Sequence, residues 1–443
     1  MAEREKIDRE ASSVLASTGA PSASIAVVRD GKLVYTQAYG EGRIDPKAKA
    51  VPSMRYAIGS VSKQFTAAAI LLLEEDGKLS LEDKVGKWFP GLTRADDISL
   101  RHLLAMTSGY RDYWPQDYVW PEMRRAATAD SIMRDWAARP LDFEPGTKWQ
   151  YSNTNYVIAA AVVEKVSGKP FLEFLRERIF DPLKMKSVVD FDSGPLAETD
   201  AGGFLRNALG PPRPAPKEGP GWLFGAGQLA MTAHDLALWD IAMIDRKALK
   251  ASSYKSKQTD TILAAGTSTG YGLGVRVAAP GGRRRISHGG AVSGYTTINH
   301  VYPDDRAAIV VFTNIYPGAA GAPGQIADKI ARILFPDGAD EDEMALKTAR
   351  RLYDGLIKGE IDRSVLSKSA DDYFSPQTLA DYAESLAPLG EPKEFVQTGK
   401  SLRGGMTIRT YRIKAKNKDV TLELTTMIRT DGRIDQYIIA RAG

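Results

Sequence analysis

A serine and a lysine three residues apart, Ser60 and Lys63, stand at the start of a strongly apolar segment that reads AAAILLL. On a helix this spacing places both side chains on one face, and the helix start offers free N–H groups to an anionic oxygen. A half-buried lysine there loses basicity and is able to take the serine proton. The alternative is a purely structural role, with an N-cap serine followed by an exposed lysine. Ser252–Lys255 has the same spacing, but its polar surroundings predict a surface loop.

A second polar element, Tyr151-Ser152-Asn153, follows Pro145 and Gly146. We expect a phenol beside an ammonium to ionise below its usual pKa of ~10 and to act as a general base. The Asn153 amide offers both a donor and an acceptor to an acyl amide or to a lysine. Taken alone, the tripeptide is more typical of a polar turn than of a catalytic site.

A third element, His288-Gly289-Gly290-Ala291, reads as a strand that runs into glycines. Glycines allow a substrate to approach the strand edge closely. We expect the backbone N–H groups of Ala291 and Ser60 to form an oxyanion hole, in which one donor is typically worth about 10²–10³ in rate. Taken alone, a histidine before a Gly-Gly turn is more typical of a structural role.

In their order SxxK, YxN and HxG, the three elements resemble the penicillin-recognising serine hydrolases, which include class C β-lactamases, DD-peptidases, D-aminopeptidases and esterases of β-lactamase fold. Further stretches are similar to the same family: Gly77–Asp83, Leu103–Gly109, Pro145–Thr147, Tyr271–Gly274 and His288–Tyr295. The resemblance covers about residues 8–335. It implies that Ser60 is the nucleophile, Lys63 its activating partner, Tyr151 a proton shuttle and Asn153 an orienting amide, and that His288 lines the substrate strand.

Position 288 departs from the class C β-lactamases, which normally carry lysine in the third motif. Histidine is mostly neutral above its usual pKa of ~6.5, so its attraction for the carboxylate of a penam or cephem is weaker. We therefore expect peptide or ester hydrolysis, most readily of a D-amino-acid peptide or a carboxylic ester. A weak β-lactamase and a penicillin-binding receptor without turnover remain alternatives. Arg284 shares the strand face of His288 and supplies either the missing charge or only a solvated side chain.

The hydrophobic pattern predicts strands at both ends of the catalytic region and helices between them. An amphipathic helix over 5–18 and a hairpin over 23–39 open the chain, and helical patterns fill about 60–190. Strands return at 272–277, 285–288, 296–302 and 307–313, followed by a closing helix at 325–334. This order predicts a mixed α/β fold, a β-lactamase/DD-peptidase-like antiparallel sheet flanked by a helical region.

An acidic, turn-rich stretch at Pro336–Glu343 predicts a domain boundary. We expect a serine hydrolase domain over 1–336 and an accessory α+β domain over 344–443. In the second domain, helical patterns precede four alternating segments at 394–398, 407–414, 420–429 and 434–440. That order resembles the curved-sheet NTF2-like domains.

Composition narrows the chemistry further. The 443 residues include no cysteine and four histidines, without an HxH or HExxH arrangement, so we expect neither a metal nor a cofactor. The net charge of +4 indicates neither nucleic-acid nor membrane binding, and the partner we expect is a small molecule or short peptide. The charged start carries no apolar signal segment, which leaves a cytoplasmic protein or a mature exported one. Assembly into a homo-oligomer is left open.

Overall fold

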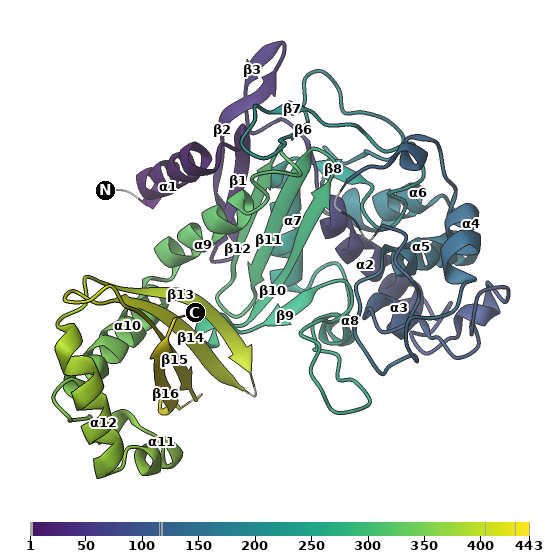
Figure 1. Cartoon of the computed structure of the whole chain (residues 1–443). Coiled ribbons are helices and arrows are strands. Elements are labelled where there is room, and N and C mark those ends of the chain that lie inside the picture. Colours follow the sequence, from purple (N-terminus) through teal and green to yellow (C-terminus); the bar gives the residue numbers. More distant parts are fainter. Residues whose placement is uncertain (1–2, 115, 117, 404, 430, 443) are drawn as a thin grey trace. The chain divides into compact units, whose positions relative to one another are not determined.

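The computed structural model describes residues 3–114, 116, 118–403, 405–429 and 431–442. The chain divides into two compact units, Met1–Leu334 and Phe335–Gly443. Each unit has its own cluster of buried apolar side chains. Figure 1 shows the strands and helices of each unit.

The first unit is built on a seven-stranded antiparallel sheet with the order β3-β2-β1-β12-β11-β10-β9. Its strands are β1 Ser22–Arg29, β2 Lys32–Ile44, β3 Lys47–Lys49, β9 Arg276–Ala278, β10 Arg285–Val292, β11 Tyr295–Tyr302 and β12 Ala307–Thr313. Strand β1 from the start of the chain pairs with β12 from its distant part, with Ala26 opposite Val310. The sheet is therefore built from N- and C-terminal segments that meet in space.

Helices cover both faces of this sheet, because β1 and β12 are apolar and almost wholly buried. Helices α1 (Glu3–Thr18) and α9 (Ala322–Leu334) pack together on one face, and α7 (Ala233–Asp245) packs on β1 and β12 from the other, as Figure 1 shows. The remaining strands of this unit form two small sheets. One has three strands in the order β4 (Tyr56–Ala57), β8 (Leu229–Met231) and β5 (Val189–Asp190), and the other pairs β6 (Phe204–Leu205) with β7 (Arg213–Pro214).

The helical region lies beside the sheet and is centred on two buried helices. Helix α2 (Lys63–Glu75) is buried from Lys63 to Leu73, and α5 (Asn153–Ser167) packs against it. Around them lie α3 Leu100–Leu104, α4 Ala129–Ile132, α6 Phe171–Leu175 and α8 Ala251–Lys257. The predicted surface loop at Ser252–Lys255 is wrong, since these residues belong to α8, in which Tyr254 and Lys257 are buried. Strand β9 is also shorter than predicted, because Gly272–Val275 fold as irregular backbone.

Among its described residues, the second unit holds a four-stranded antiparallel sheet and three α-helices. The strands, in the order β13-β14-β15-β16, are Glu394–Arg403, Met406–Lys414, Thr421–Ile428 and Ile434–Arg441. The helices are α10 Pro336–Leu356, α11 Lys368–Tyr373 and α12 Pro376–Leu386. The predicted break at Pro336–Glu343 is wrong in one respect: α10 begins at Pro336, a residue type that is well suited to the first turn of a helix. The likeness to NTF2-like domains stays a prediction.

Candidate active site

Ser60 lies in a tight turn between the sheet and α2. Residues Gly59–Ser62 form one 3₁₀ turn that runs directly into α2 at Lys63. Gly59 has a φ of +50°, and a methyl group there would lie only 2.8 Å from the backbone nitrogen of Ala291. Glycine at 59 therefore lets β10 pack against the turn, so that Ser60 lies beside the strand of His288.

The Nζ of Lys63 has three oxygen neighbours. It lies 2.7 Å from Asn153 Oδ1, 2.8 Å from the carbonyl oxygen of Ala226 and 3.0 Å from Ser60 Oγ. The first two oxygens only accept hydrogen bonds, whereas the serine hydroxyl can donate as well. A neutral amine fits these partners fully, with two N–H donors for the carbonyls and a lone pair for the Ser60 proton.

Burial determines the charge of Lys63. The side chain has no exposed surface, and this desolvation lowers the pKa of Lys63 to about 7, although the nearby Asp112 opposes the shift. The sequence-based expectation of reduced basicity is confirmed. A substantial fraction of Lys63 is therefore uncharged at neutral pH.

Tyr151 also contacts Ser60. Its hydroxyl hydrogen-bonds to Ser60, and the Nζ of Lys63 lies 5.0 Å from the centre of its ring. Burial raises the pKa of Tyr151, which is the opposite of the expected shift. The reason is physical: desolvation disfavours the phenolate, and the depressed pKa of Lys63 leaves less positive charge beside the phenol. Tyr151 is thus a neutral hydroxyl rather than a ready base.

Asn153 begins α5 and is held in place by Asp112, a residue that sequence reasoning missed. The Asp112 carboxylate accepts from the backbone N–H of Asn153 at 2.9 Å and from its Nδ2 at 3.1 Å. These bonds turn the amide oxygen of Asn153 toward Lys63. Burial raises the pKa of Asp112. The available signal was an isolated carboxylate in an aromatic loop, directly after Leu103–Gly109 and between Tyr110 and Trp114.

His288 lines the cleft, but both of its ring nitrogens have protein partners. Nδ1 lies 2.6 Å from the carbonyl oxygen of Gly289 and must donate to it, so Nε2 accepts from the Tyr271 hydroxyl at 2.9 Å. Burial, reinforced by the nearby charge of Lys63, lowers the pKa of His288 to about 3. The imidazole is therefore neutral, as expected, and does not replace the lysine charge of class C enzymes.

These side chains open onto one cleft of about 770 Å³. Ser60, Tyr151, Asn153, His288, Gly289, Gly290 and Ala291 all line it, so the structure brings together every residue predicted on its wall. Lys63 lies behind them. Arg284 is not part of the wall, since it donates to Gln258 at 2.8 Å and lies 3.5 Å from Asp304.

The cation at the cleft is instead Arg276 on β9. It is exposed, lies 5.8 Å from the centre of the Trp149 ring, and is opposite Ser287 in the sheet. Among the ion pairs of the described residues, none involves Arg276. The aromatic side chains Tyr113 and Trp114 also line the cleft.

Comparison with known proteins gives one family and a consistent set of relatives. The family described as Beta-lactamase matches residues 7–331. A putative penicillin-binding protein PbpX of Bacillus subtilis is 29% identical over 313 residues, 71% of this chain and 75% of the relative. A D-aminopeptidase of Brucella anthropi is 28% identical over 309 residues, 68% of this chain but only 57% of the relative.

Two solved structures show the same fold. A D-stereospecific amidohydrolase from Streptomyces sp. matches 74% of this chain and 97% of its own, with 25% identity and a TM-score of 0.63. An octameric penicillin-binding protein homologue from Pyrococcus abyssi covers 99% of this chain and 100% of its own, with 19% identity and a TM-score of 0.66. In the part of the chain that the structure describes, no helix has the length and apolar character needed to cross a membrane.

Proposed function

We propose that this chain, which belongs to the β-lactamase family of serine hydrolases, cleaves an amide or ester of a D-amino acid derivative through an acyl-enzyme on Ser60. The observation that carries the proposal is the set of hydrogen-bond partners around the Lys63 amine. Its Nζ lies 3.0 Å from Ser60 Oγ and donates hydrogen bonds to two carbonyl oxygens. The lone pair of the neutral amine is left for the serine proton.

Acylation follows from this arrangement. Lys63 takes the proton of Ser60 as Oγ attacks the carbonyl carbon, and a C–O bond forms while the carbonyl oxygen gains a negative charge. Backbone N–H groups of Ser60 and Ala291 stabilise that charge. The C–N or C–O bond of the substrate then breaks, and the acyl group stays on Ser60.

Tyr151 completes the proton transfer. Because burial raises the pKa of Tyr151, its hydroxyl is protonated and can give a proton to the leaving group. The phenol recovers that proton from Lys63, so no proton is gained or lost in the step. Deacylation uses Lys63 and Tyr151 in the opposite direction. A water molecule attacks the acyl carbon and gives a proton to this pair, and the bond from that carbon to Ser60 Oγ breaks. Oγ takes a proton back, which restores Ser60 and releases the acid.

The comparisons favour D-amino acid derivatives as substrates, and one cation of the cleft favours a carboxylate on them. The relatives include proteins named D-aminopeptidase, and the solved structures include a D-stereospecific amidohydrolase. In this chain, Arg276 supplies a positive charge at the cleft and favours a substrate with a carboxylate near the scissile bond. A short peptide that ends in a D-amino acid carries such a group.

A penicillin-binding receptor is the second candidate, and the relatives named penicillin-binding proteins favour it. The two functions share acylation and differ in deacylation. An enzyme releases the acyl group and turns over, whereas a receptor keeps it. In either case the neutral His288 does not supply the charge of the lysine in class C β-lactamases, and Arg276 is the cleft cation that a carboxylate would meet.

A substrate panel tests the proposal. Wild type and Ser60→Ala are assayed in parallel with D-aminoacyl p-nitroanilides, a D-Ala-D-Ala peptide, short-chain nitrophenyl esters and nitrocefin. We expect repeated turnover of a D-amino acid substrate by wild type, slower turnover of nitrocefin and none by Ser60→Ala. Equal rates for the two proteins would refute a serine nucleophile at this position. A single burst without turnover would identify a receptor.

A further inference from the structure

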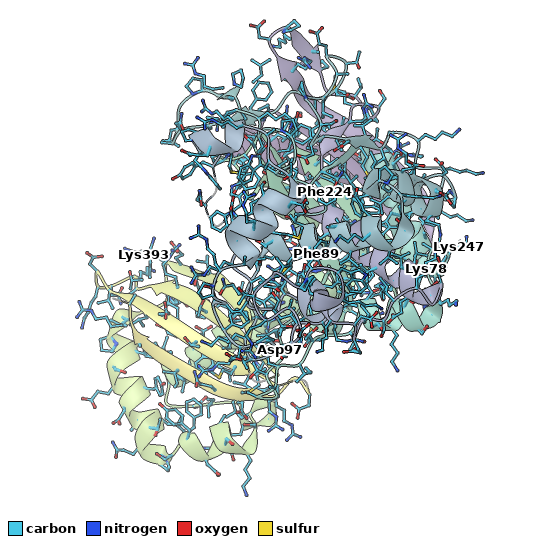
Figure 2. The ribbon with its side chains drawn as sticks, turned by 90° about the vertical axis from the view of Figure 1, so that its right-hand side faces the viewer. Lys78, Phe89, Asp97, Phe224, Lys247 and Lys393 are labelled. Carbon is cyan, nitrogen blue, oxygen red and sulfur yellow. The ribbon has the colours of Figure 1, made fainter. Side chains whose placement is uncertain are left out.

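A second lysine of the first unit is fully buried and takes no part in the chemistry above. Lys257 is the last residue of α8 and has no exposed surface. Lysines such as Lys78 and Lys247, in contrast, project from the surface of this unit, as Figure 2 shows. A buried amine needs a specific reason, because lysine is almost never fully buried unless it has partners.

The partners of Lys257 are two backbone carbonyls. Its Nζ donates to the carbonyl oxygen of Gln64 at 3.1 Å and to that of Leu273 at 3.2 Å. The carbonyl of Lys257 in turn accepts from the backbone N–H of Leu273 at 3.0 Å. Burial lowers the pKa of Lys257 to about 7, and even the neutral amine has the two N–H donors that these carbonyls require.

Both carbonyls belong to segments that carry site residues. Gln64 follows Lys63 in the first turn of α2. Leu273 precedes Gly274, which has a φ of +70° and packs so closely on α2 that a methyl group there would lie 2.7 Å from the carbonyl oxygen of Lys63. The segment that contains Leu273 and Gly274 also includes Tyr271, which hydrogen-bonds to His288. It ends at Arg276 on the cleft wall.

We propose that Lys257 is a positioning residue, which fixes the 271–276 segment against the first turn of α2 and thereby sets the placement of Lys63, Tyr271 and Arg276. The inference rests on the proposed function, because it concerns the geometry of that reaction. Lys257 acts only through these other residues and touches no reacting atom.

Stability alone does not account for a lysine at this position. Methionine has a similar length and volume and would keep the apolar contacts of the side-chain stem without the desolvation of an amine. The substitution removes the donor to the Gln64 and Leu273 carbonyls, which is costly for a buried acceptor, but it also removes the desolvation cost of the amine, so the two effects on stability oppose each other. A role in placement therefore predicts that stability and activity respond differently to this substitution.

The test compares Lys257→Met with Lys255→Met, a substitution of an exposed lysine on the same helix. Melting temperature, the rate of fluorophosphonate labelling, and kcat and KM for a nitrophenyl ester are measured for both variants and for wild type. We expect the melting temperature of Lys257→Met to stay within a few degrees of wild type, because the loss of the two hydrogen bonds is offset by the removal of a buried amine. Its labelling rate and kcat fall by about tenfold or more, since even small misplacements of catalytic groups are costly, whereas KM changes little. Lys255→Met behaves as wild type.

Two results overturn the inference. One is a labelling rate and kcat within about twofold of wild type, a difference too small to indicate misplaced catalytic groups. The other is a loss of activity explained by a lowered melting temperature, which makes Lys257 a structural residue only. If wild type itself is not labelled at Ser60, the proposed function fails before this comparison begins, so the two failures are distinguishable.

Discussion

At the scale of single residues, the chemistry depends on which neighbour of Lys63 can give it a proton. Asn153 Oδ1 and the Ala226 carbonyl accept only, which leaves the Ser60 hydroxyl as the donor. Removal from water makes the neutral amine available near neutral pH. The proposed function therefore assigns Lys63 as the base in acylation and Tyr151 as the acid.

This assignment predicts the pH dependence of acylation. Below a pH of about 7 Lys63 is protonated and inactive as a base, and above it the amine is neutral, so kcat/KM rises with pH to a plateau with its midpoint near 7. His288 is uncharged near neutral pH because burial lowers its pKa to about 3, so it adds no second inflection to the pH profile in that range. The profile is measured with a neutral ester. A midpoint near the ordinary lysine pKa of ~10.4 would contradict the assignment.

Arg276 gives a second prediction at this scale. Arg276→Leu is expected to raise KM about tenfold for a peptide with a free carboxylate, because a charge-assisted hydrogen bond is lost, and to leave KM for a neutral ester unchanged. Arg284→Leu is the matched control, because Arg284 lies outside the cleft wall. Equal effects of the two substitutions on KM for the peptide would show that the net positive charge of the protein, rather than the position of Arg276, determines peptide binding.

Sequence patterns predicted the cleft residues well, because serine, lysine, tyrosine and histidine stand at fixed spacings in segments of clear type. They did not predict Asp112, whose importance depends on contact with Asn153 across 41 positions of sequence. The direction of the Tyr151 pKa was also wrong. It depends on how much water the folded chain excludes, which spacing alone does not encode.

At the scale of elements, the essential contact joins β10 to the 3₁₀ turn of Ser60. Two adjacent glycines of β10 differ sharply there. A methyl group at Gly290 would overlap the carbonyl oxygen of Ile58, whereas one at Gly289 would meet Ile298 at 3.5 Å, an ordinary contact. The strand is therefore held close to the nucleophile at Gly290 and not at Gly289.

This difference predicts that Gly290→Ala reduces fluorophosphonate labelling of Ser60 about 100-fold, by moving β10 and its oxyanion donor away from the turn. Gly289→Ala should label at close to the wild-type rate. Circular dichroism verifies that both variants are folded. Similar labelling of both variants would show that close approach of β10 is not required.

Elements were predicted best where their apolar period is strong. Helix α2 and strands β1 and β12 fall in this group, since their burial is nearly complete. Helix α8 was missed because it is short and polar, with the sequence ASSYKSK, and becomes a helix only through the contacts of Tyr254 and Lys257 with the core.

At the scale of the whole molecule, the described residues that line the cleft belong to the first unit. They all lie between Ser60 and Gly324, and the two units have separate cores. No local pattern could show that β1 and β12 pair, because that contact joins residues almost 300 positions apart. The order of strands and helices predicted the sheet only as a class of fold.

Separate cores predict that a chain ending at Leu334 folds and is labelled by a fluorophosphonate at a rate within about twofold of the full chain, because a compact unit with its own core can fold alone. Labelling and thermal melting are measured on both chains. A folded but unlabelled fragment would show that the second unit is needed for the chemistry.

The acyl-enzyme itself is the most direct test. Protein mixed with excess D-aminoacyl ester is quenched in acid within the first turnovers, and its intact mass and peptide masses are recorded. The account predicts a mass increase equal to the acyl group, located on the peptide that contains Ser60, decaying as substrate is exhausted and absent in Ser60→Ala. Continued hydrolysis without any adduct, or an adduct that persists on another residue in Ser60→Ala, would contradict it.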